Sequence, residues 1–414
     1  MSSKPAAAAA PRIYYLTEEF YPPQIGGVEL MVSYLSHGLA ARGISTQVIT
    51  RQPSPPVLPE ETIGRVRVRR IRPGGQMKGI GWRALPAVLS YLWRLAFILL
   101  SESGRYDVVI VSGLKVIPLA AIPVCRLLGK RCIIRIESTF ELAEPLSAES
   151  LRSMGHAGRL LHGVLAHVQR YVLSRAEPVV AISREVEDML LRLGVAPARI
   201  ARIANGIDLR RFQPASPDER AKLREQMSLA QTATVVLFAG RLSRAKGIVR
   251  LVEVWPQIIA RHPQLHLVIV GSGAGSFDDC EAELAGLIRA LNLEAHATMA
   301  GATDRVQDYL RAADVFMFPS LYEGFGLGIV EALACGMIVA VTPVGVAAES
   351  IQHGVNGFLF RADDSRAIVK VIDEMLADTD AWPAIGQRAR AAAAPFDLEA
   401  IVEQFADLCR TARP

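Results

Sequence analysis

The sequence of 414 residues is poor in cysteine and has no long uninterrupted apolar segment. Its five cysteines are odd in number and no two form a Cys-x-x-Cys pair, so we expect neither a disulfide framework nor a cysteine zinc site. Zinc-finger spacing and aromatic RNA-binding motifs are also missing, which argues against nucleic acid as a partner. These absences favour a reducing compartment, and we expect the protein in the cytoplasm.

The most apolar stretch, 84–100, is short for a bilayer-spanning helix and contains Arg94. It predicts a helix that packs inside its domain or lies on a membrane surface. Residues 1–11 are rich in Ser, Ala and Pro, a composition typical of a disordered tail. The alanines in this tail are too weakly apolar for the core of a signal peptide.

Positive charge is in mild excess, with a formal net charge of +5 and a pI near 9.0. Apolar and basic residues alternate over 66–71, which predicts a strand with one basic, solvent-facing side. Two interpretations remain open: a solubilising face, or a contact for anionic lipid at the inner face of a membrane. In the second, helix 84–100 would act together with the basic residues Arg65, Arg67, Arg69, Arg70, Arg72, Lys78 and Arg83.

The remaining patterns indicate an α/β protein with two domains. Strand-like and helix-like segments alternate in both halves, which is typical of parallel sheets. The stretch 271–275 (GSGAG) follows a strand, but residue 276 is Ser, so the full Gly-x-Gly-x-x-Gly fingerprint of dehydrogenases is absent. The expected strands are 12–17, 46–50, 66–71, 107–112, 131–137, 178–183, one that begins at residue 234, 265–270, 297–301, 314–318 and 337–342.

The segment after strand 314–318 carries most of the functional information. It contains glycines that let the backbone approach a bound group, and a helix follows them. Glu323 lies in this loop, and Glu331 lies about one turn inside the helix. The carboxyl edge of a parallel strand is where open α/β sheets bind ligands, and a helix N-terminus suits a phosphate. Two carboxylates beside a phosphate site would need hydroxyl groups as well, and a sugar nucleotide has both.

Two cations occupy a comparable loop earlier in the second half. Arg241 and Lys246 follow the strand that begins at residue 234, and they precede a helix that begins at Ile248. The planar fork of arginine and the point charge of lysine both suit a diphosphate. This pair argues against a glycosidase, which would use two carboxylates without cations for a diphosphate.

The first half offers weaker signals. Gly26 and Gly27 open a long helix, where backbone N–H groups can face a ligand. Asn205 begins an Asn-Gly turn, and Asp208 is placed to cap a short helix over 209–212. Ser183 is the expected N-cap of the helix that follows strand 178–183.

Several of these segments resemble motifs of the family-4 glycosyltransferases, and the likeness runs from about residue 12 to residue 412. EGFGLGIVEALACG resembles the Glu-x7-Glu signature of the family, and GRLSRAKG resembles its Gly-Arg-x4-Lys-Gly loop. PQIGGVE and the Asn-Gly-x-Asp…Phe-x-Pro segment that begins at Asn205 match as well. The resemblance implies the GT-B fold, in which two Rossmann-like domains face each other across a cleft. The acceptor-side domain would be 12–207 and the nucleotide-sugar domain 208–390, and a final helix within 391–414 would pack on the first domain.

Members of that family transfer a sugar from a nucleotide donor with retention at the anomeric carbon, usually without a metal, so no cofactor is expected. The resemblance implies a UDP- or GDP-sugar donor and a glycan or lipid-linked acceptor, in the synthesis of cell-surface polysaccharide or glycolipid. Among the catalytic residues, Glu323 would accept hydroxyls of the donor sugar, and Arg241 and Lys246 would bind the diphosphate. Glu331 would accept the ribose hydroxyls. The other substrate-binding residues would be Gly26, Gly27, Glu137, Asn205, Gly324, Phe325, Gly326 and Leu327.

The sequence departs from the family pattern in two places. Val346 follows Gly345 where relatives have a second glycine, and Ala348 replaces a proline, so this loop is stiffer and would hold the donor sugar differently. Many relatives carry a histidine near Glu137, so Glu137 either does positional work or marks an altered site. A GT-B-fold epimerase and a non-catalytic sugar-nucleotide sensor remain alternatives. Three histidines are interpreted as ordinary helix or loop residues: His156, His162 and His167.

Overall fold

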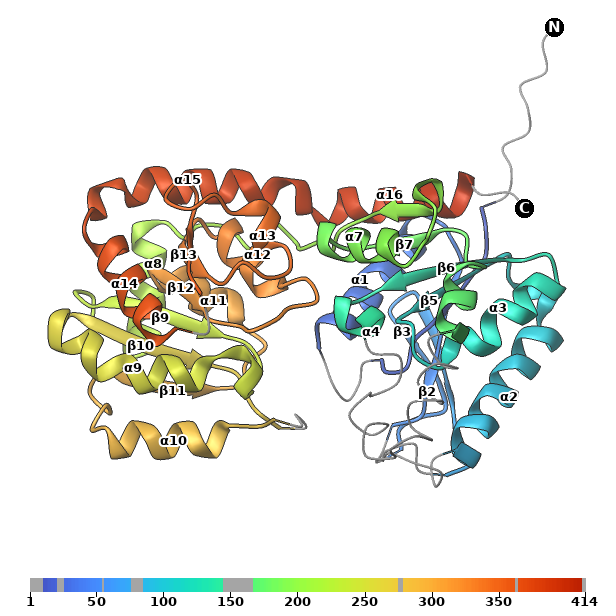
Figure 1. Ribbon diagram of the computed structural model, residues 1–414, viewed down its shortest axis with the longest axis horizontal. Coiled ribbons are helices and arrows are strands. Elements are labelled where there is room, and N and C mark those ends of the chain that lie inside the picture. The colour runs from blue at the N-terminus through green and yellow to red at the C-terminus, as the bar shows by residue number, and fades with distance from the viewer. Residues whose placement is uncertain are drawn as a thin grey trace, which may run out of the picture. The chain divides into compact units, whose positions relative to one another are not determined.

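The computed structural model describes residues 10–20, 26–53, 56–75, 85–143, 167–274, 278–361 and 364–411. The chain forms two compact units: unit 1 comprises 1–206 with 398–414, and unit 2 comprises 207–397. Figure 1 shows a sheet with helices around it in each unit. Most of the predicted tail, together with Lys78, Arg83, His156 and His162, lies outside the described residues.

Unit 1 contains one sheet with the strand order β3-β4-β2-β1-β5-β6-β7-β8. Neighbouring strands are parallel, except that β3 runs antiparallel to β4. Strands β1 and β5 are buried along their whole length, as expected for a parallel sheet covered on both faces. The strands are β1 (Ile13–Leu16), β2 (Thr46–Arg51), β3 (Glu60–Ile63), β4 (Val66–Ile71), β5 (Val108–Ser112), β6 (Arg131–Ile136), β7 (Val179–Ala181) and β8 (Ile200–Arg202).

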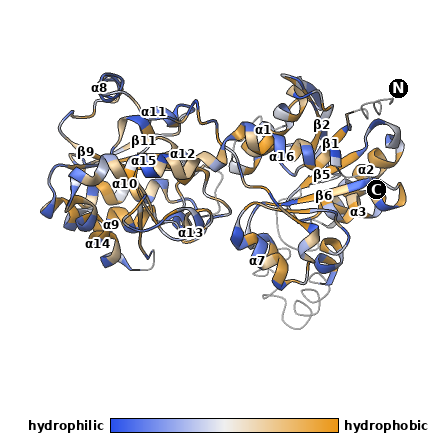
Figure 2. Ribbon diagram, turned by 90° about the horizontal axis from the view of Figure 1, so that it is seen from above, coloured by the Kyte–Doolittle hydropathy of each residue, from blue (hydrophilic) through white to orange (hydrophobic). Residues whose placement is uncertain are grey.

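The helices of unit 1 pack in pairs beside this sheet: α1 lies against α16, and α2 lies against α3. Figure 2 shows hydrophobic and hydrophilic residues side by side on many helices, the pattern of elements that bury one face. Within the described ranges, no helix combines the length and the hydrophobicity that a bilayer-spanning segment requires. The helices are α1 (Gly27–Ala41), α2 (Leu85–Ser101), α3 (Ile117–Leu127), α4 (Thr139–Ala143), α7 (Arg184–Arg192) and α16 (Leu398–Thr411).

Unit 2 contains an entirely parallel sheet with the order β11-β10-β9-β12-β13-β14. Its strands are β9 (Thr234–Ala239), β10 (Leu265–Val270), β11 (Ala297–Gly301), β12 (Val315–Phe318), β13 (Ile338–Val341) and β14 (Phe358–Leu359). Its helices are α8 (Pro217–Gln226), α9 (Ile248–Arg261), α10 (Glu281–Ala290), α11 (Val306–Ala312), α12 (Leu327–Ala334), α13 (Ala347–Ser350), α14 (Ser365–Leu376) and α15 (Trp382–Ala393). The predicted α/β class with two parallel sheets is confirmed.

The C-terminal region differs from the single helix expected over 391–413. Helix α15 ends at Ala393, a short 3-10 turn spans Ala394–Phe396, and α16 begins at Leu398. Pro395 lies in this turn and cannot donate a helical hydrogen bond, which accounts for the interruption.

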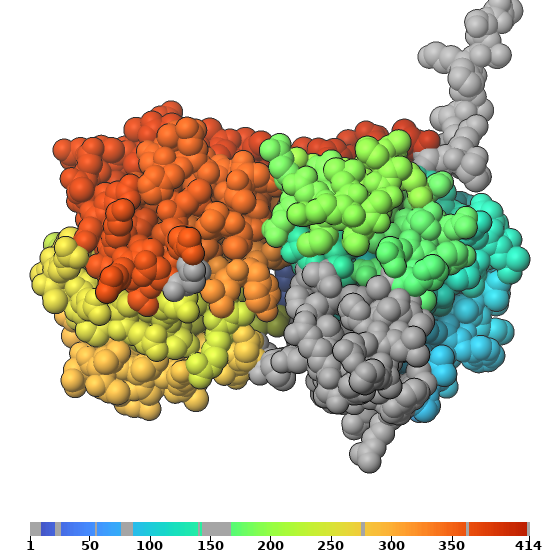
Figure 3. All heavy atoms as spheres, viewed as in Figure 1, coloured from blue at the N-terminus to red at the C-terminus, as the bar shows by residue number. Residues whose placement is uncertain are grey.

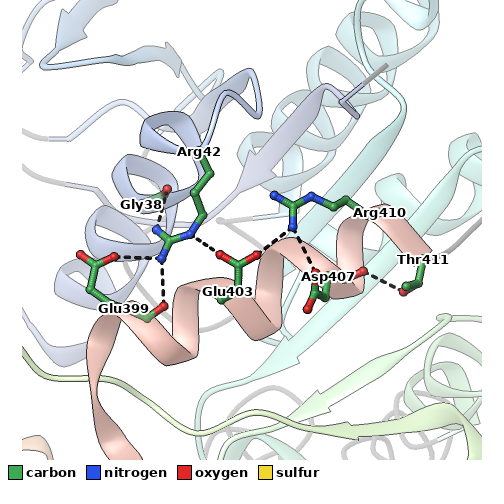
Figure 4. A network of polar contacts seen from close by, with 7 residues as sticks. All are labelled: Gly38, Arg42, Glu399, Glu403, Asp407, Arg410 and Thr411. Carbon is green, nitrogen blue, oxygen red and sulfur yellow. Dashed lines mark hydrogen bonds and ion pairs between the residues drawn. The ribbon is translucent and has the colours of Figure 1, made fainter. Parts of the chain in front are cut away.

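Helix α16 belongs to unit 1, where polar contacts tie it to α1 (Figure 4). Arg42 donates through Nη2 to Glu399 Oε2 at 2.8 Å and through Nε to Glu403 Oε2 at 2.7 Å. Ile401, Val402 and Phe405 are buried on the apolar side of α16. Burial of these side chains is the main source of stability in this contact, because exposed ion pairs contribute little.

Two local predictions were wrong. The segment 209–212 forms a turn and not a helix, although Asp208 does accept from the backbone N–H of Arg210 at 2.9 Å. Strand β4 exposes Arg67 as expected, but Arg70 is buried and pairs with Glu61. Strand β3, which supplies Glu61, is not among the strands expected from the sequence.

Candidate active site

Three loops of unit 2 meet at the carboxyl edge of its sheet, after the adjacent strands β9, β12 and β13. The loop after β12 donates from the N–H of Leu321 to the carbonyl of Ala245 at 2.8 Å, which links it to the loop after β9. The loop after β13 donates from the N–H of Val346 to the carbonyl of Phe325 at 2.8 Å. Backbone hydrogen bonds therefore fix the loop after β12 from both sides.

Lys246 and Glu323 are in direct contact within this cluster of loops. Lys246 Nζ lies 2.6 Å from Glu323 Oε1, and their side chains are 22% and 11% exposed. Lys246 also lies over the ring of Phe318, with Nζ 5.8 Å from the ring centroid. Because the ammonium group has three N–H donors, it can hold Glu323 and still donate to a further acceptor.

The N-terminus of α12 presents backbone donors beside this pair. Gly326 is the N-cap residue and adopts the left-handed conformation, with φ 93° and ψ 55°. Among the described residues, no acceptor contacts the N–H groups of Gly326, Leu327 and Gly328. Gly324 is half-buried, and Phe325 is buried with its ring edge-on to Phe396. Free N–H groups at a helix N-terminus favour an anionic ligand.

Glu331 lies on α12 and is only partly exposed, and its carboxyl group receives no hydrogen bond from any residue in the described part of the chain. Desolvation raises the pKa of its carboxyl to about 7, and the nearby positive charge of Arg211 opposes this rise. A carboxyl group with unused acceptor capacity suits a ligand with hydroxyl groups.

Arg241 follows β9 but is exposed, and its side chain has no hydrogen bond or ion pair to a described residue. The structure thus joins Lys246 and Glu323 but does not bring Arg241 into contact with either of them. A long arginine side chain at this edge remains able to reach an anion, since nothing within the described ranges holds it.

The glycine pair of unit 1 lies at the start of α1, as expected. Gly26 has an extended backbone with φ −109°, and Gly27 is the first residue of α1. The N–H of Gly26 donates to Glu29 Oε2 at 2.8 Å, so a side chain from the first turn of α1 already accepts this hydrogen bond. The N–H of Gly26 is therefore not free to bind a ligand in this conformation.

Glu137 and Asn205 share a buried partner that the sequence analysis missed. Arg135 is fully buried in β6 and donates to Glu137 Oε1 and to Asn205 Oδ1. Ser112 also donates to Glu137 Oε1. A buried arginine needs a carboxylate partner. The position of Arg135 among the apolar residues of the strand RCIIRI was therefore the signal in the sequence for a buried ion pair. Arg135 and Glu137 thus connect Ser112 at the end of β5 with Asn205 in one network.

A cavity of about 170 Å³ opens at the carboxyl edge of the sheet of unit 1. Glu141, one of its lining residues, has a pKa raised to about 7 by burial and by the charge of Glu137. The lining is rich in carboxylates, and cations pair with some of them: Lys115 with Glu18 at 3.2 Å, Arg51 with Glu19 at 2.8 Å, and Arg135 with Glu137. The lining residues are Thr17, Glu18, Glu19, Val28, Glu29, Ser112, Gly113, Lys115, Ile117, Glu137 and Glu141.

Comparison of the chain with models of known families shows which proteins share this combination of two sheets and a loop cluster with a cation and carboxylates. Residues 25–211 match the family model described as Glycosyltransferase Family 4. Residues 219–392 match the model described as Glycosyl transferases group 1. The chain belongs to the family-4 glycosyltransferases.

Individual relatives agree with this assignment. The glycosyltransferase is 29% identical to the D-inositol 3-phosphate glycosyltransferase of Xylanimonas cellulosilytica, over 92% of this chain and 91% of the relative. Sucrose-phosphate synthase from Thermosynechococcus elongatus has a similar fold, with a TM-score of 0.77, 25% identity, and coverage of 97% of this chain and 98% of that one. Anabaena HepE, solved in complex with UDP, has a TM-score of 0.75 at 23% identity and covers 97% of this chain and 100% of its own.

The loop that departs from the family pattern is tightly packed in this glycosyltransferase. Val346 is fully buried, and Gly345 has a positive φ of 55°. A Cβ atom on Gly345 would lie 2.4 Å from the carbonyl oxygen of Phe325 and 3.1 Å from Cβ of Glu323. Gly345 therefore lies close to Phe325 and Glu323, and the space at this position fits only a residue without a Cβ atom.

Proposed function

We propose that this glycosyltransferase binds the diphosphate of a UDP- or GDP-sugar with Lys246, Arg241 and the N-terminus of α12. In this proposal Glu323 accepts hydroxyls of the donor sugar and Glu331 accepts those of the ribose. The observation that supports it most is the contact between Lys246 Nζ and Glu323 Oε1 at 2.6 Å. The side chain proposed to bind the diphosphate therefore contacts the side chain proposed to bind the sugar. This arrangement suits a donor in which the phosphate is bonded directly to the sugar.

The chemical role proposed for these groups is stabilisation of the leaving group. Cleavage of the bond between the anomeric carbon and the phosphate oxygen leaves negative charge on the diphosphate. Preorganised cations and N–H donors stabilise that charge more than they stabilise the intact donor, which lowers the barrier. The acceptor oxygen bonds to the anomeric carbon on the same face, and its proton passes to the leaving phosphate oxygen. Such a front-face reaction retains the configuration and needs no protein base.

Release of nucleoside diphosphate tests the proposal, with a panel of UDP-, GDP- and ADP-sugars as donors. We expect one nucleotide class to raise the unfolding temperature, because a ligand that binds only the folded state stabilises it. We also expect release of the matching diphosphate to require an acceptor. Release of no diphosphate with any acceptor would support a sensor, and conversion of the donor to an epimer would support an epimerase; either result contradicts the proposal.

The pKa of Glu331 leads to a prediction about pH. Below about pH 7 its carboxyl is protonated and a poorer acceptor for two ribose hydroxyls, so the KM for the donor is expected to rise several-fold from about pH 8 to about pH 6. In a Glu331→Gln variant the KM is expected to be higher but nearly independent of pH. A variant that keeps the pH dependence of the KM would contradict a ribose-binding role for Glu331.

The same pKa has a consequence for stability. The pKa in the folded protein, about 7, lies above the ordinary value of 4.5. Between these values the folded protein retains a proton that the unfolded chain has lost, so the free energy of unfolding falls as the pH rises through this window. Glu141 acts in the same direction. Urea unfolding at several pH values is expected to show a smaller fall for Glu331→Gln than for the unaltered protein.

The acidic cavity of unit 1 supports the proposed acceptor class. Carboxylates accept hydrogen bonds from hydroxyl groups, so the lining suits a glycan or the sugar of a lipid-linked acceptor. We assign the acceptor to this cavity and Glu137 to its support, because Glu137 is anchored by Arg135 and Ser112. We further propose that the reaction takes place in the cytoplasm, at the inner face of a membrane, in the synthesis of cell-surface polysaccharide or glycolipid.

A further inference from the structure

Helix α2 exposes large apolar side chains on one face. Leu89, Trp93, Phe97 and Leu100 are 56%, 69%, 58% and 42% exposed. Their spacing of four, four and three residues places them along a single helical stripe. The rings of Trp93 and Phe97 stack with centroids 5.8 Å apart. A stripe of this size on a folded protein indicates an interaction surface and not scattered exposure.

The other side of α2 is already used for packing. Tyr91, Leu95 and Leu99 are fully buried, and α2 lies against α3. In Figure 1 the helix runs along the outside of unit 1, and Figure 3 shows atoms in the blue of α2 at its surface. The exposed stripe is thus a second apolar face, which packing inside unit 1 does not require.

Two arginines accompany the aromatic pair. A shallow cavity of about 320 Å³ lies at this face. Its lining includes the rings of Trp93 and Phe97 and the side chains of Arg69, Arg72 and Arg94. Arg72 and Arg94 are exposed, and neither makes a hydrogen bond or an ion pair with any other described residue. The neighbouring carboxylates are engaged elsewhere: Arg69 pairs with Glu60 and Glu102, and Arg70 pairs with Glu61.

We propose that this face of α2 docks on the surface of an anionic lipid bilayer, with the rings of Trp93 and Phe97 among the headgroups and Arg72 and Arg94 against lipid phosphates. Aromatic rings favour the boundary between headgroups and acyl chains, and cations near them add attraction to anionic lipid. The free charges on this face are positive, which matches a phosphate surface better than a second copy of this basic chain. The helix is the one expected from the sequence, but the cations differ, because Arg69 and Arg70 are paired with carboxylates and Arg94 of α2 is exposed.

The purpose of the docking, access to a lipid-linked acceptor, rests on the proposed function. The docking itself is measured without turnover. The full chain is sedimented with vesicles of phosphatidylcholine alone and with added phosphatidylserine. We expect the unaltered protein to bind strongly only when phosphatidylserine is present. The double variant Trp93→Ser and Phe97→Ser is expected to bind at least tenfold more weakly. The double variant Arg72→Gln and Arg94→Gln is expected to lose the preference for anionic lipid. Leu191→Ser on α7, where Leu191 is 40% exposed, is the matched control and is expected to bind normally.

Three outcomes would overturn the docking proposal. These are no binding of the unaltered protein to phosphatidylserine vesicles, equal binding of the aromatic double variant, or self-association that this variant abolishes in the absence of vesicles. Circular dichroism of each variant identifies any loss of folding. An enzyme that releases nucleoside diphosphate but does not bind vesicles contradicts the docking alone, and one that binds vesicles but releases no diphosphate contradicts the proposed function alone.

Discussion

Replacement of Lys246 by alanine is expected to lower turnover by roughly 100- to 1,000-fold, which corresponds to about 2.7–4 kcal/mol of lost transition-state stabilisation. The side chain is held by Glu323 at 2.6 Å, so it is fixed before the donor binds and needs little reorganisation when charge develops on the diphosphate. Glu323→Ala and Arg241→Ala are expected to cause losses of a similar order. The measurement is the acceptor-dependent release of nucleoside diphosphate at saturating donor.

Arg244→Ala is the matched control for Lys246→Ala. Arg244 lies two residues earlier in the same 3-10 turn, Arg244–Lys246, but it is exposed and pairs with Glu283 at 2.8 Å. We expect near-normal turnover for this variant, because it removes a cation of the turn without altering the pair with Glu323. Near-normal turnover of all three variants at Lys246, Glu323 and Arg241 would show that the site is assigned wrongly.

Replacement of Gly247 by alanine is expected to destabilise the protein by on the order of 3–5 kcal/mol and to abolish turnover. Gly247 has φ 71°, and a Cβ atom there would lie 2.0 Å from the carbonyl oxygen of Pro319. The added methyl group must push apart the loops that carry Lys246 and Glu323. The midpoint of urea unfolding and the release of nucleoside diphosphate measure the two effects.

Gly354 offers a control with a similar positive φ. Its φ is 73°, but a Cβ atom there would have no neighbour within 4 Å. Gly354→Ala is therefore expected to cost only about 1–2 kcal/mol, the penalty of the left-handed conformation alone, and to keep most of the activity. If Gly247→Ala shifts the unfolding midpoint no further than Gly354→Ala, the close approach of the two loops is not required.

Most of the candidate site in unit 2 could be predicted from the sequence, because its residues stand in a short loop after a buried strand or in the first turns of the helix that follows. Glu323 follows β12 and Lys246 follows β9, and parallel strands bring such loops to one edge. Caps were equally local: Ser183 accepts from the N–H of Val186 at 3.3 Å, as predicted. The contact of Gly26 with Glu29 from the following turn is local as well, and the ligand-binding role of Gly26 stays a prediction.

The residues that the sequence analysis missed depend on partners far away in the chain. Arg135 connects Glu137 with Asn205, and Asn205 lies seventy positions after Arg135 in the chain. Arg69 and Arg70 of β4 are neutralised by carboxylates of β3 and by Glu102, so their charge could not be judged from the alternation of residues 66–71. A pattern of apolar and basic residues shows which face is apolar, but not which charges are already paired.

The amino-acid sequence by itself determined the α/β class, the loops that hold Lys246 and Glu323, the helix that holds Glu331, and the family, because these depend on residues close together in the chain. Only the tertiary structure decided that Lys246 contacts Glu323, that Glu331 has a pKa near 7, and that α2 keeps a second apolar face uncovered. Contact, desolvation and exposure depend on which distant segments pack together, and local pattern does not contain that information.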